Sequence, residues 1–346
     1  MAHTRPWLHV IGGGLTILLC GLVGCGKKSS PATSPAVAAF STIVSATYVD
    51  NPAAIDTPTP EPSPTSTTPP IVTLAPPPTE SLPAAPEQSA TAYDESILIA
   101  RMTDEINRDR SAAGLDPVAW DGIAARAGEL HAIDMITRGF FSHWNPDGLG
   151  PDHRYSAAGG IHIVRENLYT FSSRFSDGSG APIDNWLEVI DRAQSELMNS
   201  SGHRDNILDP AHTHVGIGMS YDPATGQFVL AQEFTNQHVQ LGSPLPREAR
   251  PGDDIRVAGT FGPAVVGGTI LDLAYEPSPA PLSRAKLATR NTYMSAAQTL
   301  GAARSVGLSF DETLTLPSTP GYYHVRLFAD LANGQTIVLD QIIVIQ

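Results

Sequence analysis

The first regular pattern of apolar and polar positions begins near Tyr93 and predicts helices. Apolar residues recur there at every third or fourth position with polar residues between them, which is typical of helices that bury one face. One helix is expected to end at Gly114, a second to span Gly122 to Arg138, and a third to span Asn185 to Asn199. Asp184 precedes the third helix and is a candidate N-cap, because its side chain can accept hydrogen bonds from the first turn.

Each expected helix carries an apolar face that would pack on a core. The positions on these faces are Leu98, Met102 and Ile106 in the first helix, Ile123, Ala127 and Leu130 in the second, and Trp186, Val189, Ile190, Ala193 and Leu197 in the third. What these faces pack against depends on the elements that follow the third helix.

After residue 214 the apolar period changes from helical to two, which predicts strands. Val215, Ile217 and Met219 alternate with other residues, and a second run carries Phe228, Leu230 and Phe234. The sequence Tyr-Asp-Pro at 221–223 is a turn signal between the two runs. Helices followed by an antiparallel hairpin predict an α+β layered domain, which we place over residues 91–240.

Residues 241–346 show short alternating runs broken by proline and glycine, which predict an all-β domain. Strands are expected over Ile255–Phe261, Thr269–Tyr275, Tyr323–Ala329 and Ile337–Ile345, with Asn-Gly at 333–334 as a hairpin turn. This pattern favours an immunoglobulin-like β-sandwich. The segment at 320–323, Pro-Gly-Tyr-Tyr, resembles the tyrosine corner of such folds. The region has no cysteine pair, histidine cluster or basic stripe, so a role in spacing or recognition is expected.

The N-terminus reads as an export signal. Arg5 precedes an apolar, glycine-rich run from Leu8 to Val23, which has the length of a signal-peptide core. The run ends in Leu-Val-Gly-Cys at 22–25, which resembles a bacterial lipobox. We therefore expect residues 1–24 to be a lipoprotein signal peptide and Cys25 to be lipidated, which would anchor the protein to the membrane on its extracytoplasmic side. An ordinary signal peptide or membrane anchor is the alternative.

Residues 25–90 are rich in proline, threonine and serine. The stretches 57–64 and 75–79 hold prolines at nearly every second position or in a row, and proline neither donates a backbone hydrogen bond nor continues a helix. This composition predicts a disordered, extended linker that would hold the folded part away from the membrane.

Composition excludes several classes of function. The 21 Lys+Arg against 35 Asp+Glu give a net charge of −14, which argues against electrostatic binding of nucleic acid. The chain has two cysteines, Cys20 and Cys25, so neither a disulfide framework nor a multi-cysteine zinc site is expected.

Five short motifs follow one another across the predicted α+β domain. They are His-Ala-Ile-Asp-Met at 131–135, Arg-Gly-Phe-Phe-Ser-His at 138–143, Glu-Asn-Leu-Tyr at 166–169, Ser-Gly-His-Arg-Asp-Asn-Ile-Leu at 201–208, and Thr-His-Val-Gly-Ile-Gly at 213–218, with Gln-Glu-Phe at 232–234 after them. In this order they resemble the CAP family, which groups cysteine-rich secretory proteins, antigen 5 and pathogenesis-related protein 1. The resemblance covers about Tyr93 to Asn236 and implies an α-β-α sandwich with a central cleft in a secreted or surface-exposed protein.

The resemblance also places a candidate site. His143, Glu166 and His203 fall on the family's cleft positions, and Ser200 stands where many eukaryotic members have a second glutamate. Two imidazoles and one carboxylate can hold a divalent cation, zinc or another, with room for water. Without a metal, a histidine beside a carboxylate can act as a general base. A purely structural hydrogen-bond network is the third interpretation.

Other polar residues are expected to have structural roles. We expect His131 to be a buried or supporting histidine, His212 and His214 to face solvent and sheet, and Asn206 to brace its loop. Glu196 lies about one turn before Ser200 and is expected to be a solvated helix residue.

Three functions fit these observations. The favoured one is a lipid-anchored extracellular CAP protein whose cleft binds an unidentified extracellular ligand, with or without a divalent cation. A metal-dependent hydrolase of the peptidase kind would use the same three residues as catalytic groups. A non-catalytic cell-surface interaction module would bind through the C-terminal domain.

Overall fold

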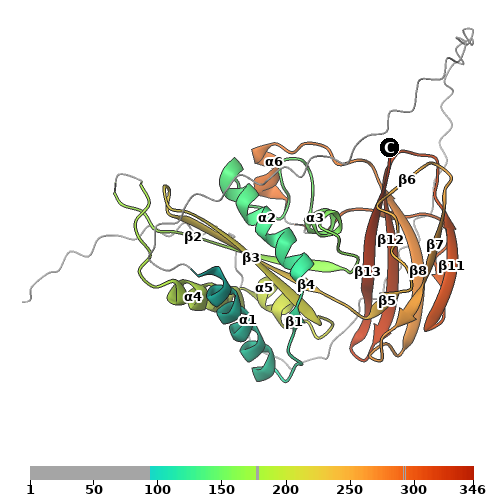
Figure 1. Ribbon diagram of the computed structural model, residues 1–346, viewed down its shortest axis with the longest axis horizontal. Helices are drawn as coiled ribbons and strands as arrows, with labels where there is room; N and C mark the ends of the chain where they lie inside the picture. Colours follow the sequence, from blue (N-terminus) through green and yellow to red (C-terminus); the bar gives the residue numbers. More distant parts are fainter. Residues whose placement is uncertain (1–93, 177–178, 291, 293) are drawn as a thin grey trace, which may run out of the picture. The chain divides into compact units, whose positions relative to one another are not determined.

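The computed structural model describes residues 94–176, 179–290, 292 and 294–346, which all belong to one compact unit of the chain, Thr79–Gln346 (Figure 1). The predicted signal peptide, the lipidated Cys25 and the linker lie outside the described residues. Within the described part, none of the helices combines the length and apolar character needed to cross a membrane.

The first half of the described chain is a four-stranded sheet with helices on both faces. The strands are β1 (Ala119–Trp120), β2 (Val164–Ser172), β3 (His214–Asp222) and β4 (Gln227–Thr235), in the order β1-β3-β4-β2. Strand β1 is parallel to β3, and the other pairs are antiparallel. The α+β class predicted for this region is therefore confirmed.

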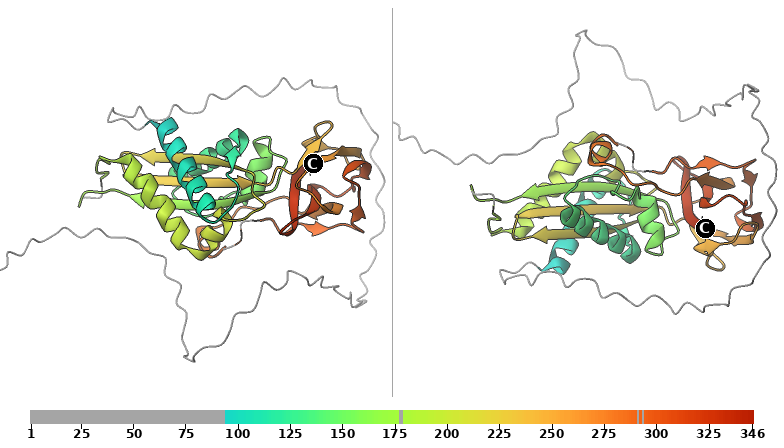
Figure 2. Two further views of the ribbon diagram at one scale, coloured as in Figure 1. Left: turned by 90° about the horizontal axis from the view of Figure 1, so that it is seen from below. Right: turned by 90° about the horizontal axis from the view of Figure 1, so that it is seen from above.

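Two groups of helices cover this sheet. The helices α1 (Glu95–Ala112), α4 (Trp186–Asn199) and α5 (Ser201–Ile207) pack on one face, and α2 (Gly122–Arg138) and α3 (Pro151–Ala157) pack on the other. The opposite views of Figure 2 show these two layers in turn. The larger core lies under α1 and α4 and contains the apolar positions predicted for both helices.

The helix boundaries follow local signals. Helix α2 has the predicted bounds, begins after Asp121, whose side chain accepts hydrogen bonds from the first turn, and ends at Gly139 in a left-handed conformation with φ of 64°. Helix α4 is capped by Asn185, whose side chain accepts a hydrogen bond from the Glu188 backbone N–H. The prediction that Asp184 is the cap was therefore wrong by one position.

The buried face of α2 also differs from the prediction. Ile123 and Leu130 are exposed, and the helix buries small residues instead: Ala124, Ala127, Gly128 and Ala132. The reason is a close approach to β3. A Cβ atom added at Gly216 would lie 2.0 Å from the Ala125 backbone nitrogen, and one at Gly218 would lie 2.0 Å from that of Glu129.

The hairpin predicted after residue 214 is confirmed as β3 and β4, with the turn between Asp222 and Gln227. Four elements of this region had no counterpart in the sequence analysis: α3, α5, the short strand β1 and the outer strand β2. Strand β2 is nine residues long and pairs with β4 along its whole length. It lies at the edge of the sheet, where polar residues can reach solvent.

The second half of the described chain is a C-terminal β-domain of two sheets. The larger sheet holds β10 (Arg304–Ser305), β8 (Gly267–Glu276), β12 (Gly321–Leu331), β13 (Gly334–Ile345) and β6 (Glu248–Ala249), in this order, with β9 (Gln298–Thr299) also paired to β8. The smaller sheet holds β11 (Ser309–Thr315), β7 (Asp254–Phe261) and β5 (Val239–Leu241). A short helix, α6 (Arg284–Thr289), follows β8 in the chain.

Side chains from both sheets form one core in the C-terminal β-domain. Val257 and Phe310 from the smaller sheet and Tyr323, Val325 and Ile343 from the larger sheet belong to it. The Tyr323 hydroxyl donates a hydrogen bond of 2.7 Å to the Thr319 carbonyl, four residues upstream. This is the contact expected of a tyrosine corner.

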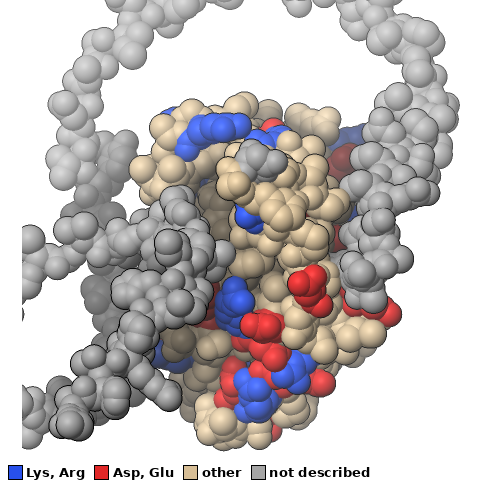
Figure 3. All heavy atoms as spheres, turned by 90° about the vertical axis from the view of Figure 1, so that its left-hand side faces the viewer, with Lys and Arg blue, Asp and Glu red and all other residues tan. Residues whose placement is uncertain are grey.

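Charged residues on α1 and α4 form pairs on the surface. Arg101 donates to Asp191 at 2.7 Å and lies 2.9 Å from Glu105. In the face shown in Figure 3, lysine and arginine side chains near the lower edge lie directly beside aspartate and glutamate. This mixed arrangement agrees with the negative net charge and does not form a basic surface for nucleic acid on the face shown.

Candidate functional site

The predicted site residues Glu166 and His143 are in direct contact at the outer strand β2. Glu166 is 2 % exposed and points toward α2 and α3, on the same side of β2 as Val164 and Leu168. His143 lies in the loop after α2, and its Nδ1 is 2.7 Å from Glu166 Oε1. This contact fixes the ring and, with the proton on Nδ1, makes Nε2 the basic nitrogen.

Arg154, from α3, binds both partners of this pair. Its Nη2 donates to Glu166 Oε2 at 2.6 Å, and its Nη1 donates to the His143 carbonyl at 2.8 Å. Burial by itself would raise the pKa of Glu166, but the positive charge of Arg154 and the hydrogen bond with His143 outweigh it and hold the pKa well below its usual range. Glu166 is therefore ionised at neutral pH, and each of its oxygens has a partner.

His131 supports the loop that carries His143. Its side chain is fully buried on α2, and its Nε2 donates a hydrogen bond of 2.9 Å to the Ser142 carbonyl. Burial, together with the charge of Arg154, lowers the pKa of His131 to about 3, so the ring is neutral. The prediction of a buried, supporting histidine is confirmed.

A second carboxyl, Glu233, faces Glu166 from β4. The two residues are cross-strand partners, and Glu233 is 1 % exposed beneath Gly128 of α2. Burial and then the negative charge of Glu166 raise the pKa of Glu233 well above its usual range. Within the described part of the chain no donor reaches either Glu233 oxygen, and the raised pKa favours the protonated form of the Glu233 carboxyl that faces Glu166. The pKa of Glu166 is therefore lowered and that of Glu233 is raised, as in the acid–base pairs of enzymes.

His203, the third predicted residue, approaches β2 from the other side of the sheet. It lies on α5, which is tied to β2 because Asn167 Nδ2 donates to the His203 carbonyl at 3.2 Å and Asn206 Nδ2 donates to Asn167 Oδ1 at 2.9 Å. Burial lowers the pKa of the half-buried His203, and the charge of His143 lowers it further. The two imidazoles therefore share one electrostatic environment at the edge of the sheet. Asn206 braces the loop, as predicted.

The three predicted ligands, His143, Glu166 and His203, do not form a compact metal site in the structure. Among the described residues, ligand atoms within 4.8 Å of one another occur in two other groups, and the set of His143, Glu166 and His203 is not one of them. Glu166 is already engaged by Arg154 and His143. Ser200 has no carboxylate, and Glu196 is exposed on α4 and belongs to neither of the two groups. Metal binding by the three residues stays a prediction.

The other two histidines assigned from sequence behave differently from each other. His212 is 3 % exposed and stacks on Phe234 with ring centroids 5.1 Å apart, so the expectation that it faces solvent was wrong. It is buried because the turn before β3 is covered by Asn206 and Asn236, both within hydrogen-bond distance of its ring. His214 is half-exposed, as expected.

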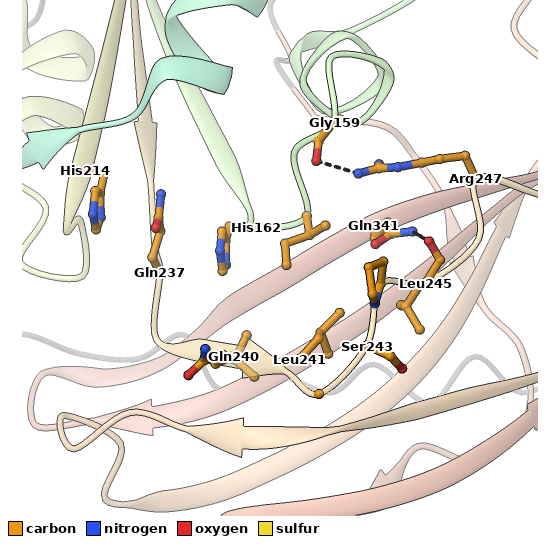
Figure 4. A pocket seen from close by; sticks show the side chains of 14 residues that line it. Gly159, His162, His214, Gln237, Gln240, Leu241, Ser243, Leu245, Arg247 and Gln341 are labelled. Carbon is orange, nitrogen blue, oxygen red and sulfur yellow. Dashed lines mark hydrogen bonds between the residues drawn. The ribbon is translucent and has the colours of Figure 1, made fainter.

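A pocket of about 580 Å³ lies between the α+β domain and the C-terminal β-domain (Figure 4). His162, His214 and Gln237 line it from the first domain, and the segment 239–245 lines it from the second. Arg247 closes one end, where its guanidinium donates to the Gly159 carbonyl at 2.6 Å. None of its lining residues belongs to the His143–Glu166 contact, so the pocket is a separate feature.

Two site residues, Arg154 and Glu233, escaped the sequence analysis. Glu233 lies in a strand that contains a run of consecutive apolar residues, Phe228 to Ala231, and such a strand is buried on both faces. A carboxyl there has to be buried, which was a usable signal. Arg154 carried no such signal, because the short helix α3 was not predicted.

Part of the chain is similar to known proteins. Residues 103–234 match the model of the CAP, or cysteine-rich secretory protein, family. A Bacillus subtilis (strain 168) protein named Uncharacterized protein YkwD is 27% identical over 130 residues, which are 38% of this chain and 43% of the relative.

Two solved structures are also similar. An extracellular protein containing an SCP domain from Bacillus anthracis str. Ames is 24% identical, with 43% of this chain and 45% of that chain covered and a TM-score of 0.34. An outer surface protein from Borrelia burgdorferi is 17% identical, with 41% and 95% covered and a TM-score of 0.33. The chain spans less than half of the length of both Bacillus proteins. The motifs and the matching family model show that the chain carries a bacterial CAP domain, that of the cysteine-rich secretory protein family, over residues 103–234.

Proposed function

We propose that this chain is a lipid-anchored extracellular CAP-domain protein that binds a ligand in a cleft formed by His143, Glu166 and His203. The observation that carries the proposal is the contact between Glu166 and His143. A buried carboxylate, fixed by Arg154, orients an imidazole that is itself 21% exposed. Such rigid support for a partly exposed polar group is typical of binding and catalytic sites.

The polarity of the cleft indicates what a ligand would contact. His143 and His203 come from opposite sides of β2, and both are partly exposed. Imidazoles can donate and accept hydrogen bonds, and they can hold a divalent cation that bridges to an anionic ligand. The proposal covers binding with or without such a cation.

Binding is tested by titrating the purified full chain with peptide and ester ligands, in the absence and in the presence of Zn²⁺. The expected result is binding of a peptide or ester ligand that His143→Ala and His203→Ala each weaken by at least about tenfold, as the loss of one hydrogen bond in the site would do. His214→Ala, a half-exposed histidine away from the cleft, is the matched control and should bind like the wild type. Unchanged binding in both cleft variants would contradict the proposal.

A hydrolase is the second candidate, because one observation favours it. The Nδ1 contact with Glu166 prepares His143 to accept a proton through Nε2, which is what a general base needs. Turnover of a peptide or ester that disappears in His143→Ala would favour this candidate. Ligand binding without turnover favours the first, and a stable chain with neither would favour an interaction module acting through the C-terminal β-domain.

Anchoring at Cys25 belongs to the same proposal. The lipobox-like sequence at 22–25, the proline-rich residues 25–90 and the family's extracellular members support a folded part held outside the membrane by a linker. We expect Cys25→Ala to move the protein from the membrane fraction to the soluble fraction, because two or more acyl chains give stable anchoring that the variant loses. Cys20→Ala is the control, and retention of Cys25→Ala in the membrane fraction would contradict lipidation at this residue.

The C-terminal β-domain is proposed to be an immunoglobulin-like sandwich that spaces or presents the CAP domain. Two sheets with a common core and the hydrogen bond from Tyr323 to the Thr319 carbonyl support this assignment.

A further inference from the structure

A second group of histidines and carboxyls lies where the CAP domain meets the larger sheet of the C-terminal β-domain. On one face of this sheet, β8 carries Glu276 and β12 carries His324, and both approach His153 from α3. The opposite face of β12 holds the apolar core residues such as Val325. His324 stood alone in the sequence of the C-terminal region, and only the fold brings His153 to it. We name His153, Glu276 and His324 the junction cluster.

The three side chains of the junction cluster offer ligand atoms that lie within 4.8 Å of one another. Both histidines direct Nε2 at the same carboxylate oxygen: His153 Nε2 is in very short contact with Glu276 Oε1, and His324 Nε2 is 3.3 Å from it. Two ligands about 2.0 Å from a tetrahedral metal are roughly 3.3 Å apart. The second distance already fits, and the first pair has to open slightly.

Each histidine also has an aspartate oxygen close to its Nδ1. Asp340 Oδ1 is 2.7 Å from His324 Nδ1, and Asp152 Oδ1 is 3.0 Å from His153 Nδ1. A carboxylate that accepts from Nδ1 of a histidine whose Nε2 binds a metal is a recurrent arrangement around protein metal ions, because it fixes the tautomer and the ring orientation. His324 and Asp340 form such a pair, and His153 and Asp152 form one when Nδ1 of His153 carries the proton.

The cluster is almost closed to solvent. The His153 and His324 side chains are 2% and 0% exposed, and Glu276 lies at the rim with 13%. Ser295 covers it: its backbone N–H donates to Asp152 Oδ2 at 2.9 Å, and its Oγ is 3.4 Å from His324 Nε2. The Ser295 hydroxyl or a water can occupy a fourth coordination position.

We infer that the junction cluster binds one divalent transition-metal ion of the zinc class through His153 Nε2, Glu276 and His324 Nε2, and that this ion fastens the CAP domain to the C-terminal β-domain. Imidazole and carboxylate ligands suit such ions. Asp152, Glu276 and Asp340 surround the two rings, with Arg326 Nε 3.4 Å from Asp340 Oδ2, and a divalent cation would add positive charge among these carboxylates.

Binding requires a change of tautomer at His153. In the structure described here the Gly150 backbone N–H donates to His153 Nδ1 at 3.0 Å, so the ring proton is on Nε2 and faces Glu276. When the metal takes Nε2, this proton leaves that nitrogen and Nδ1 becomes protonated, with Asp152 Oδ1 as its acceptor. The Gly150 N–H then loses Nδ1 as its acceptor, and Glu276 exchanges a hydrogen bond for a metal bond.

The test uses the full chain, freed of metal with a chelator and desalted, with Co²⁺ and Zn²⁺ as probes. We expect one equivalent of metal to stay with the chain after desalting. Bound Co²⁺ should show visible ligand-field bands of a nitrogen and oxygen site without a thiolate charge-transfer band, which excludes Cys20 and Cys25 as ligands. Zn²⁺ should raise the midpoint of thermal unfolding, because it binds the folded chain.

Variants separate this site from the cleft. His324→Ala and Glu276→Gln should each weaken metal binding by at least about 100-fold, and Asp340→Asn by about 10- to 100-fold, since it acts through His324. His143→Ala and His203→Ala should leave the Co²⁺ bands unchanged. Because His324→Ala removes a fully buried ring and can prevent folding, Glu276→Gln, which keeps the shape of a residue at the rim, decides the question.

The inference is overturned by either of two results. One is a wild-type chain that keeps no metal after desalting, which would make the junction cluster an ion-pair network holding protons. The other is metal that Glu276→Gln binds as tightly as the wild type, and loss of the metal in His143→Ala would then assign it to the cleft.

Discussion

The cleft and the junction cluster contain the same kinds of residue and are built in opposite ways. In the cleft, the carboxylate of Glu166 is balanced by Arg154, a permanent cation, and His143 reaches solvent. In the junction cluster, the partners of Glu276 are two histidines, and both are buried. An arginine fixes the charge of a site, whereas histidines can exchange a proton for a metal. These differences underlie the two proposals: a ligand that exchanges with solvent at His143, and a metal ion that stays in the junction cluster.

The largest effect is expected from removing Arg154, the permanent cation beside Glu166. Arg154→Met leaves Glu166 buried without its cation and should lower the free energy of unfolding by about 3–5 kcal/mol. Urea denaturation followed by circular dichroism measures it. Arg126→Met is the control, because its partner Glu129 is on the surface and the loss there should stay below about 1 kcal/mol. Equal effects of the two substitutions would show that Glu166 is not held by Arg154.

The pH dependence of the stability tests the contribution of the Glu166 carboxylate. The pKa of Glu166 is lower in the folded chain than its ordinary value of 4.5, so its contribution to stability is present above pH 4.5 and is lost as the pH falls through the folded value. Urea unfolding between pH 7 and pH 3 should show this decline. Glu166→Gln removes the titrating group, so a slope below pH 4.5 as steep as that of the wild type would contradict the assignment.

The smallest expected effect distinguishes the two carboxyls of the cleft. Because burial and the charge of Glu166 raise the pKa of Glu233 well above its usual range, we predict that Glu233 is protonated at neutral pH and that the neutral amide of Glu233→Gln imitates it. The free energy of unfolding at pH 7 should change by less than about 1 kcal/mol, whereas Glu166→Gln should cost about 3 kcal/mol by leaving Arg154 unpaired. If Glu233→Gln costs as much as Glu166→Gln, Glu233 is ionised.

Much of the CAP domain could be predicted because its helices and hairpin obey simple periods. Helix α4 buries the five residues that a helical period selects. Helix α2 shows the limit of this rule: its bounds were correct, yet Ile123 and Leu130 are exposed, because a helix that nearly touches a sheet has room for alanine and glycine. The buried face of a helix depends on the size of its side chains and on the surface against which it packs. The period of apolar residues gives no information about either.

The candidate site was predictable where a motif carried it. The contact of His143 with Glu166 was expected from the resemblance, but Arg154 and Glu233 were not. The junction cluster was beyond sequence reasoning, because 171 positions separate His153 from His324 and they meet only through the packing of α3 on the larger sheet. The alternating pattern of β12 predicts that His324 points away from the apolar core. That face of the strand is also buried, because other parts of the fold pack against it.

The bare backbone of β3 has a consequence for the cleft. Because Gly216 and Gly218 carry no side chain, α2 lies directly on the sheet, and His131 on that helix meets the carbonyl just before His143. A methyl group at either glycine would act as a wedge that lifts the helix and moves the His143 loop with it. Two residues without any functional group thus set how far the imidazole reaches toward its carboxylate.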